Sequence, residues 1–205
     1  GGTILVANLM SKFIKNVNLV IYQNRSVFGN FKNLISKKVK LIKINNIDYR
    51  PLIKNRFIDN YNKKVLSQIN YNNYLSNNNK IEKKLINFIK NKIKSKNHLI
   101  CLDYGHGMIT PKLLKYLNTL NGKISINCQT NSSNFGFNLA TKYKKGDTMC
   151  IDTQEFRLCV QDKYSDLKYL LNKNKSFTKK FKKFIVTTGR YGCYVVSNDK
   201  IYNYF

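Results

Sequence analysis

The chain has 205 residues, 42% of them apolar, which suffices for one domain with a sizeable core. Its 37 lysines and arginines against 10 acidic residues give a net charge of +27. No apolar run approaches the roughly 18 residues of a transmembrane helix, which disfavours a membrane protein, and only two prolines and ten glycines argue against a low-complexity chain. Five cysteines without a Cys-x-x-Cys pair indicate reduced, buried thiols and a cytoplasmic protein.

The positive charge admits two interpretations. A field of this sign attracts nucleic acid. However, the lysines are spread over every segment, and no arginine cluster with interleaved aromatic residues offers a surface for base stacking. A solvated lysine surface is therefore the preferred interpretation, and steeply salt-dependent binding to DNA would mark the alternative.

Strand and helix patterns alternate along the chain. Short β-branched or aromatic segments bounded by polar residues predict strands at 17–22, 40–44, 98–102, 123–127, 148–151 and 184–187. Apolar residues at three- and four-residue spacing predict an amphipathic helix over 80–96, either packed on a sheet, which we prefer, or lying on a membrane surface. Further helices are expected at 3–15, 111–117 and 163–171. This alternation predicts an α/β fold with a mostly parallel sheet.

Residues 48–70 interrupt the alternation. Segments 51–59 and 65–70 read as two β segments joined by an Asn- and Lys-rich turn. Within an α/β protein we expect such a hairpin to form an edge of the fold or a lid over a site.

Residues 101–110, Cys-Leu-Asp-Tyr-Gly-His-Gly-Met-Ile-Thr, carry the strongest functional signal. An apolar strand ends in Asp103 and a glycine-spaced turn, and a helix follows. This arrangement marks the carboxyl edge of a parallel sheet, where open α/β folds bind ligands. Glycine at 105 and 107 lets backbone amides approach a substrate, and Asp103 either accepts hydrogen bonds from substrate hydroxyls or caps the turn that follows it.

Five elements occur in one order along the chain: Gly1-Gly2 with Val6-Ala7, Lys54-x-Arg56, Asp103-Tyr-Gly-x-Gly, Asp152-Thr-Gln-Glu155-Phe and Thr187-Thr-Gly189-Arg-Tyr-Gly192. Together they resemble the ribokinase-like (PfkB) carbohydrate kinases, and most closely the heptose-phosphate kinase part of ADP-heptose synthases. Residues 127–143, which begin Asn-Cys-Gln-Thr-Asn, resemble a further signature of a related kinase subgroup. The resemblance covers essentially the whole chain. It implies a three-layer α/β sandwich with a mostly parallel central sheet and a small β lid, here incomplete.

The resemblance also implies an activity, namely ATP-dependent phosphorylation of a sugar or sugar phosphate with Mg²⁺ as cofactor. It assigns substrate binding to Gly1, Gly2, Asn8, Lys54, Arg56, Asp103 and Gly105. It assigns ATP binding to Asn127, Gln129, Thr187, Gly189 and Gly192. Asp152 and Glu155 would ligate magnesium, and the alternative for this pair is a helix N-cap with Glu at the third helical position, a capping box. Lys54 and Arg56 alternate onto one strand face, either toward a phosphate or simply into solvent.

Two departures from the family pattern stand out. Leu5 occupies the position of a sugar-binding Asn, for which Asn8 substitutes one turn later. The Gly-Ala-Gly-Asp loop that carries the family's general base is missing, since Gly146-Asp147 is the only Gly-Asp pair and lacks its context. We therefore expect the central portion of a kinase, lacking both ends, with no catalytic residue of its own and inactive alone.

The resemblance raises two further expectations for the full protein: a homodimer, and fusion to a nucleotidyltransferase domain. A non-catalytic sugar- or nucleotide-binding module of the same fold is the alternative function. A downstream Gly-Ala-Gly-Asp motif in the same reading frame would favour the kinase over the module.

Overall fold

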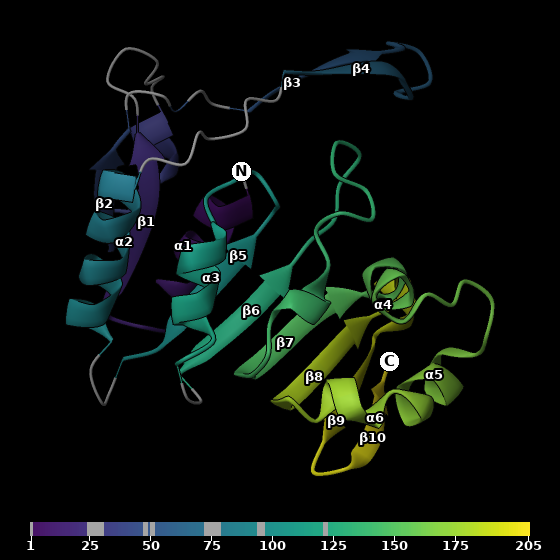
Figure 1. The fold of residues 1–205 in the computed structure, drawn as a ribbon. Coiled ribbons are helices and arrows are strands. Elements are labelled where there is room, and N and C mark those ends of the chain that lie inside the picture. Colours follow the sequence, from purple (N-terminus) through teal and green to yellow (C-terminus); the bar gives the residue numbers. More distant parts are fainter. Residues whose placement is uncertain are drawn as a thin grey trace. The chain divides into compact units, whose positions relative to one another are not determined.

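The structure is a computed structural model that describes residues 2–23, 31–46, 49, 52–71, 79–93, 97–120 and 123–205. The chain divides into two compact units, Gly1–Leu85 and Ile86–Phe205, each described here by itself (Figure 1). The domain expected from the sequence spans both units. No helix within the described ranges combines the length and the hydrophobicity needed to cross a lipid bilayer.

In the first unit, a helix packs on a pair of parallel strands. Helix α1 (Gly2–Met10) precedes β1 (Val17–Gln23), and a 3-10 turn, η2 (Phe31–Leu34), leads to β2 (Val39–Asn45). The two strands pair in parallel from Val17 opposite Val39, and Ala7, Leu19 and Val39 form the centre of a small apolar core. Both predicted strands are confirmed, whereas α1 ends before the predicted limit because residues 11–13 form a turn.

Helix α2 (Asn79–Lys92) corresponds to the amphipathic pattern predicted over 80–96, of which 94–96 lie outside the described residues. Its apolar residues Leu85, Ile86 and Ile89 are buried. Burial of these three residues agrees with a packed helix and disfavours the membrane-surface alternative.

An antiparallel hairpin forms where the sequence interrupts the alternation. Strands β3 (Ile53–Ile58) and β4 (Val65–Tyr71) pair with a bulge between Phe57 and Ile58, and residues 48, 50 and 51 of the expected element are not described. Side chains on a strand alternate between faces, so Lys54 and Arg56 share one face. Ile53 and Phe57 lie on the other face. Every residue of β3 is exposed.

The second unit contains a six-stranded mixed sheet in the order β10-β9-β8-β7-β6-β5. Strands β5 (Leu99–Asp103), β6 (Ile124–Cys128), β7 (Gly146–Asp152) and β8 (Phe181–Thr187) are parallel, which confirms the mostly parallel sheet. The antiparallel strands β9 (Cys193–Ser197) and β10 (Lys200–Tyr204) were not predicted. The sequence did contain a signal for their turn, the pair Asn198-Asp199. In the structure these residues adopt the positive φ angles of +49° and +63° that hairpin turns favour.

Helices of the second unit connect the parallel strands. Helix α3 (Pro111–Leu117) links β5 to β6, and a 3-10 turn, η3 (Ala140–Lys142), precedes β7. Helices α4 (Thr153–Val160), α5 (Leu167–Lys173) and α6 (Lys175–Thr178) link β7 to β8, and η4 (Gly189–Tyr191) follows β8. Helix α3 matches its prediction, and α5 begins four residues after the start and ends two residues beyond the end of its predicted range of 163–171. The start of α4 was foreseen only as the capping-box alternative at Asp152, and α6 was not predicted.

The two faces of this sheet differ in burial. Strand pairing aligns Cys101, Ile126, Met149 and Phe184 in one buried row across β5 to β8. Aromatic rings from α4 and α6 cover this face, since the Phe184 ring centroid lies 5.7 Å from that of Phe156 and 5.2 Å from that of Phe177. The opposite face is only partly covered, and Ile100 on it is exposed. Whether a strand side chain is buried therefore depends on the face of the sheet on which it lies.

Candidate functional site

The carboxyl ends of the four parallel strands meet at one edge of the sheet. Asp103 pairs with Cys128 at the ends of β5 and β6, and Asp152 pairs with Thr187 at the ends of β7 and β8. Three of the motifs identified in the sequence thus converge on a single edge, because parallel strands of similar length end together. Asp103 belongs to the buried face and Asp152 to the partly covered one, because strand pairing places them on opposite sides of the sheet.

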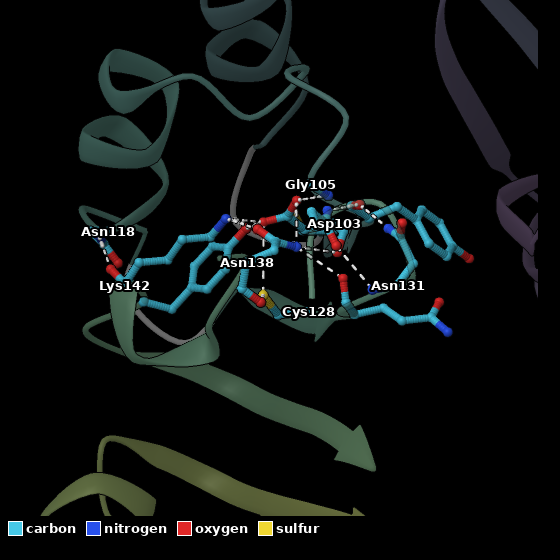
Figure 2. A network of polar contacts seen from close by, with 12 residues as sticks. Asp103, Gly105, Asn118, Cys128, Asn131, Asn138 and Lys142 are labelled. Atoms are coloured by element: carbon cyan, nitrogen blue, oxygen red, sulfur yellow. Dashed lines mark hydrogen bonds and ion pairs between the residues drawn. The ribbon is translucent and has the colours of Figure 1, made fainter. Parts of the chain in front are cut away.

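Asp103 is the centre of a buried polar network (Figure 2). Its side chain is only 3% exposed. One carboxylate oxygen accepts from the Gly105 backbone N–H at 2.9 Å, and the other accepts from the Tyr143 hydroxyl at 2.8 Å and pairs with Lys142 Nζ at 2.5 Å. Asn138 donates to the Asp103 backbone carbonyl at 3.1 Å. Of the two roles expected for Asp103, the turn-capping contact is present, and the carboxylate is surrounded by protein donors.

Burial raises the pKa of two groups that adjoin Asp103. It strongly raises the pKa of the Tyr143 hydroxyl, and it raises the pKa of the Cys101 thiol to about 12. Tyr143 therefore remains a hydrogen-bond donor to Asp103 at neutral pH, with Cys101 Sγ at 3.7 Å from its hydroxyl. Neither Cys101 nor Cys128 has the exposed thiolate of a reactive cysteine, because both are buried and have raised pKa values.

The loop that follows β6 is fastened to the turn that follows β5. Asn131 and Asn134 each donate a side-chain N–H to the Tyr104 carbonyl oxygen at 2.9 Å. Gly105 lies directly beneath this loop at a φ of +69°, and a Cβ there would come within 2.1 Å of Asn134 Nδ2. The Asp103 motif and the Asn-rich segment thus form one structural unit, and Gly105 is required by close approach as well as by backbone angle.

At the next strand end, Asp152 and Glu155 form a capping box at the start of α4. Asp152 Oδ1 accepts from the Glu155 N–H at 2.7 Å, and Glu155 Oε2 accepts from the Asp152 N–H at 2.8 Å. Glu155 Oε1 accepts from the Thr130 N–H at 2.9 Å. Burial raises the pKa of the Glu155 carboxyl. The alternative that the sequence left open for this pair is therefore realised in the structure.

These contacts bear on the expected magnesium site. Both oxygens of Glu155 are engaged by backbone N–H groups, whereas Asp152 is exposed and its Oδ2 has no hydrogen bond among the described residues. The described ranges also contain no group of three or more His, Cys, Asp and Glu side chains that could hold a metal ion. Glu155 is buried and each of its oxygens already accepts a backbone N–H, so the exposed Asp152, with Oδ2 free of hydrogen bonds among the described residues, is the better placed of the two to contact magnesium.

An open depression of about 480 Å³ lies beside this cap. It is lined by residues of the β7–α4 junction, of α5 and of the turn after β8: Asp152, Thr153, Gln154, Leu167, Thr187, Thr188, Gly189 and Tyr191. Thr153 Oγ1 donates to the Thr187 carbonyl at 3.0 Å and joins its two sides. Arg190 stacks on the neighbouring Tyr191 ring, with its guanidinium carbon 4.8 Å from the ring centroid.

The residues predicted to bind ATP divide into two groups. Thr187 and Gly189 line the depression. Asn127, Gln129 and Gly192 do not: Asn127 donates to the Cys150 carbonyl, Gln129 donates its backbone N–H to the Asp103 carbonyl, and Gly192 lies against the Tyr204 backbone. Thr153, Gln154, Leu167, Thr188 and Tyr191 were missed, although Thr188 and Tyr191 belong to the motif that identified Gly189.

The remaining predicted substrate residues belong to the first unit. Gly1 lies outside the described residues, and Gly2 begins α1. The Asn8 side chain donates to the Leu34 carbonyl at 2.7 Å and accepts from the Ser36 N–H at 2.9 Å, so it fastens α1 to the segment before β2. Lys54 and Arg56 are exposed on one face of the hairpin, where Arg56 donates to Gln68 at 2.8 Å.

Comparison with known proteins gives a fold. No family model and no curated protein matches the chain. Phosphofructokinase-2 from Escherichia coli in complex with fructose-6-phosphate is similar to it with a TM-score of 0.70 at 11% identity, over 100% of this chain and 67% of that one. The same protein in complex with substrates and products has a TM-score of 0.68 at 13% identity, over 99% of this chain and 66% of that chain. Its tetrameric inhibited form has a TM-score of 0.64 at 11% identity, over 99% of this chain and 66% of that chain.

The chain thus has the ribokinase-like α/β fold with a mixed, mostly parallel sheet, as the sequence motifs predicted. It spans about two thirds of the length of these structures.

The close approach at Gly105 predicts an asymmetric response to alanine. Gly105→Ala should destabilise the protein more than Gly136→Ala, because Gly136 has a similar φ of +79° but open space around its Cβ position. We expect about 1–2 kcal/mol for Gly136→Ala from backbone strain, and roughly a further 1–3 kcal/mol for Gly105→Ala from displacing Asn134 and its hydrogen bond. Urea unfolding of both variants measures this difference, and equal losses would contradict the packing described here.

We expect the hydrogen bond from the Tyr143 hydroxyl to Asp103 to contribute to the free energy of unfolding in a pH-dependent way. Tyr143→Phe should lower the free energy of unfolding by about 1–3 kcal/mol at pH 7, because a buried carboxylate loses a donor. The pKa of Tyr143 in the fold is above that of an unfolded tyrosine, about 10. Its contribution is therefore complete below pH 10 and declines as the pH rises further. The difference between wild type and Tyr143→Phe should shrink above pH 10 in urea titrations, and a constant difference would refute this assignment.

Proposed function

We propose that this chain belongs to an ATP-dependent kinase that phosphorylates a sugar phosphate, with its binding site at the carboxyl edge of the parallel sheet. The observation that carries the proposal is the depression beside the α4 cap, which contains Thr187 and Gly189 of the motif expected to meet ATP. The ribokinase-like fold supports the same location, because open α/β folds bind ligands outside the carboxyl ends of their strands.

The depression offers groups that a nucleotide could use. Thr153, Thr187 and Thr188 supply hydroxyl groups, and Gly189, at a φ of +62° with open space around it, leaves its backbone accessible to a ligand. Arg190 follows directly and places a guanidinium beside the depression, where it would meet a phosphate. Phosphoryl transfer depends on positioning and charge neutralisation, and these are the functions that such groups provide.

For the acceptor, we propose the turn at Tyr104 and Gly105. Lys54 and Arg56 remain proposed contacts for a substrate phosphate from the sequence motif alone. Both cationic side chains are exposed and share one strand face, which suits a divalent anion. Gly1, Gly2 and Asn8 remain proposed contacts from the sequence motif. A heptose phosphate is the acceptor that the motif resemblance favours, and fructose-6-phosphate, which phosphofructokinase-2 binds, is the natural comparison.

Magnesium would neutralise phosphate charge when bound with the nucleotide. Asp152 is the residue that would contact it, through its free oxygen. We assign no step to the metal, and no described side chain is proposed as the general base.

A specific observation favours the second candidate, a non-catalytic binding module. Three acidic side chains lie at this edge: Asp103, Asp152 and Glu155. The carboxylates of Asp103 and Glu155 are committed to buried hydrogen bonds. An edge with one free carboxylate can bind a phosphorylated ligand without supplying acid–base chemistry.

Nucleotide binding tests the proposal. We expect an ATP analogue to bind the chain, and Thr187→Val to raise its dissociation constant roughly 3–10-fold through loss of one hydroxyl contact. Thr119→Val, which removes an exposed hydroxyl after α3, is the matched control and should leave the constant unchanged. Calorimetric titration gives both values. Absence of binding at millimolar nucleotide would refute the assignment.

Turnover separates the two candidate functions. ADP formation with fructose-6-phosphate or a heptose phosphate supports the kinase. Binding without ADP formation supports the module.

We also propose that the hairpin forms a homodimer interface. One of its faces carries the apolar side chains Ile53, Phe57, Ile69 and Tyr71, each about half exposed. An isolated two-stranded hairpin with an uncovered apolar face is marginally stable in water. A second copy that stacks the same face against it would bury these residues symmetrically.

The dimer proposal predicts that Phe57→Lys yields a monomer, because it places a charge within the apolar face. Asn70→Lys adds the same charge to the polar face and should leave the dimer intact. Light scattering after size-exclusion chromatography gives both masses. A monomeric wild-type chain at micromolar concentration would refute the interface.

A further inference from the structure

Glu155 connects two strand ends. Its side chain is 6% exposed, and its two oxygens accept from N–H groups that belong to different segments. Oε1 accepts from the N–H of Thr130, which lies just after β6, at 2.9 Å. Oε2 accepts from the N–H of Asp152, the last residue of β7, at 2.8 Å. Only a carboxylate can accept from two backbone donors in this way, because an amide has one accepting oxygen and a nitrogen that donates.

From Thr130 the contacts continue to the turn after β5. The Thr130 hydroxyl and the Asn131 N–H both bond to Asn134, and Asn131 and Asn134 both hold the Tyr104 carbonyl. Asn138, at the end of the same loop, holds the carbonyl of Gln129 at 3.0 Å. The loop over residues 129–138, which we name the asparagine loop, is thus rigidly bonded to the proposed acceptor turn.

On its other side, Glu155 fixes the start of α4. Asp152, which it holds in the capping box, and the adjacent Thr153 line the depression proposed to bind the nucleotide. Removing the Glu155–Thr130 contact would leave the hydrogen bonds within the asparagine loop and those within the α4 cap in place, but would remove this connection between the loop and the cap. Among the described residues, the Thr130 N–H has no other hydrogen-bond partner.

We propose that Glu155 is a positioning residue that couples the acceptor turn to the nucleotide depression through the asparagine loop, and does not ligate the metal that the motif resemblance assigns to it. This inference rests on the proposed function for the identity of the two ligands. Because each ligand would fix a residue that is bonded to this loop, binding of the first ligand would favour the geometry that the second requires. Coupling of this kind is reciprocal and commonly amounts to about 5-fold or more in affinity.

The first test needs no ligand. Hydrogen exchange is compared among wild type, Glu155→Gln and Glu82→Gln; Glu82 is the only other glutamate in the chain and is also buried. Glu155→Gln should speed exchange at Thr130 and across the asparagine loop and the Tyr104–Gly105 turn, roughly 10-fold or more relative to wild type, which corresponds to losing one buried hydrogen bond. Glu82→Gln should leave these amides unchanged. Unchanged protection at the turn in Glu155→Gln overturns the proposal.

The second test measures coupling by titrating a non-hydrolysable ATP analogue with and without fructose-6-phosphate. In wild type, the sugar phosphate should tighten nucleotide binding about 5-fold or more. In Glu155→Gln this factor should fall toward one, whereas Glu82→Gln should retain it. A merely structural role would weaken the separate affinities without changing their ratio, so an unchanged factor overturns the proposal.

Two further outcomes complete the design. If wild type binds neither ligand, the proposed function fails, and hydrogen exchange alone decides whether Glu155 joins the two halves. If Glu155→Gln loses binding of Mn²⁺ while its exchange protection stays intact, Glu155 is a metal ligand and the proposal is overturned. Should Glu155→Gln fail to fold, Glu155→Asp replaces it: its carboxylate is one methylene shorter, cannot reach both donors, and should show the same loss.

Discussion

A carboxylate that is 3% exposed must be fully hydrogen-bonded and offset by positive charge, and Asp103 meets this requirement with partners from separate segments. Its own turn supplies the Gly105 N–H, and the segment that leads into β7 supplies Tyr143 and the Lys142 ammonium. The chain between β6 and β7 must therefore return to the end of β5. This return places the asparagine loop at the edge of the sheet, where it holds the Tyr104 carbonyl and covers Gly105.

Side-chain alternation explains why neighbouring motifs at this edge have different surroundings. Asp103 lies two residues from Cys101 and so belongs to the buried face. Asp152 and Thr187 belong to the opposite face, which the described helices leave partly open, and there they border the depression. The edge thus combines a buried, extensively hydrogen-bonded part on one face of the sheet with an accessible part on the other. Glu155 lies at the start of α4 and reaches both.

This division has a chemical consequence. Acidic side chains at the carboxyl edge of an α/β sheet suggest acid–base or metal chemistry, yet two of the three here stabilise backbone geometry. What the edge offers to a ligand is hydroxyl groups, backbone at Gly189 and a guanidinium at Arg190. The proposed binding of a phosphorylated ligand rests on these groups and on the net charge of +27, through neutralisation and orientation.

The sequence by itself determined the alternation of strands and helices, because hydrophobic periodicity is local and survives without tertiary context. The order of motifs led correctly to the ribokinase-like fold, and the run from Leu99 to Leu117 was predicted almost to the residue. Strands β9 and β10, which follow a glycine-rich turn, were missed. The start of α4 was foreseen only through the capping-box alternative, since it lies within a motif read for its chemistry.

Only the tertiary structure decided what the acidic residues do. A motif gives the position of a carboxylate along the chain, but its free oxygens depend on which backbone N–H groups other segments bring to it. Thr130 and Tyr143 reach Glu155 and Asp103 from 25 and 40 residues away. Leu167 joins the depression from a separate helix for the same reason. Such contacts depend on how β5, β6 and β7 pair, which no local pattern encodes.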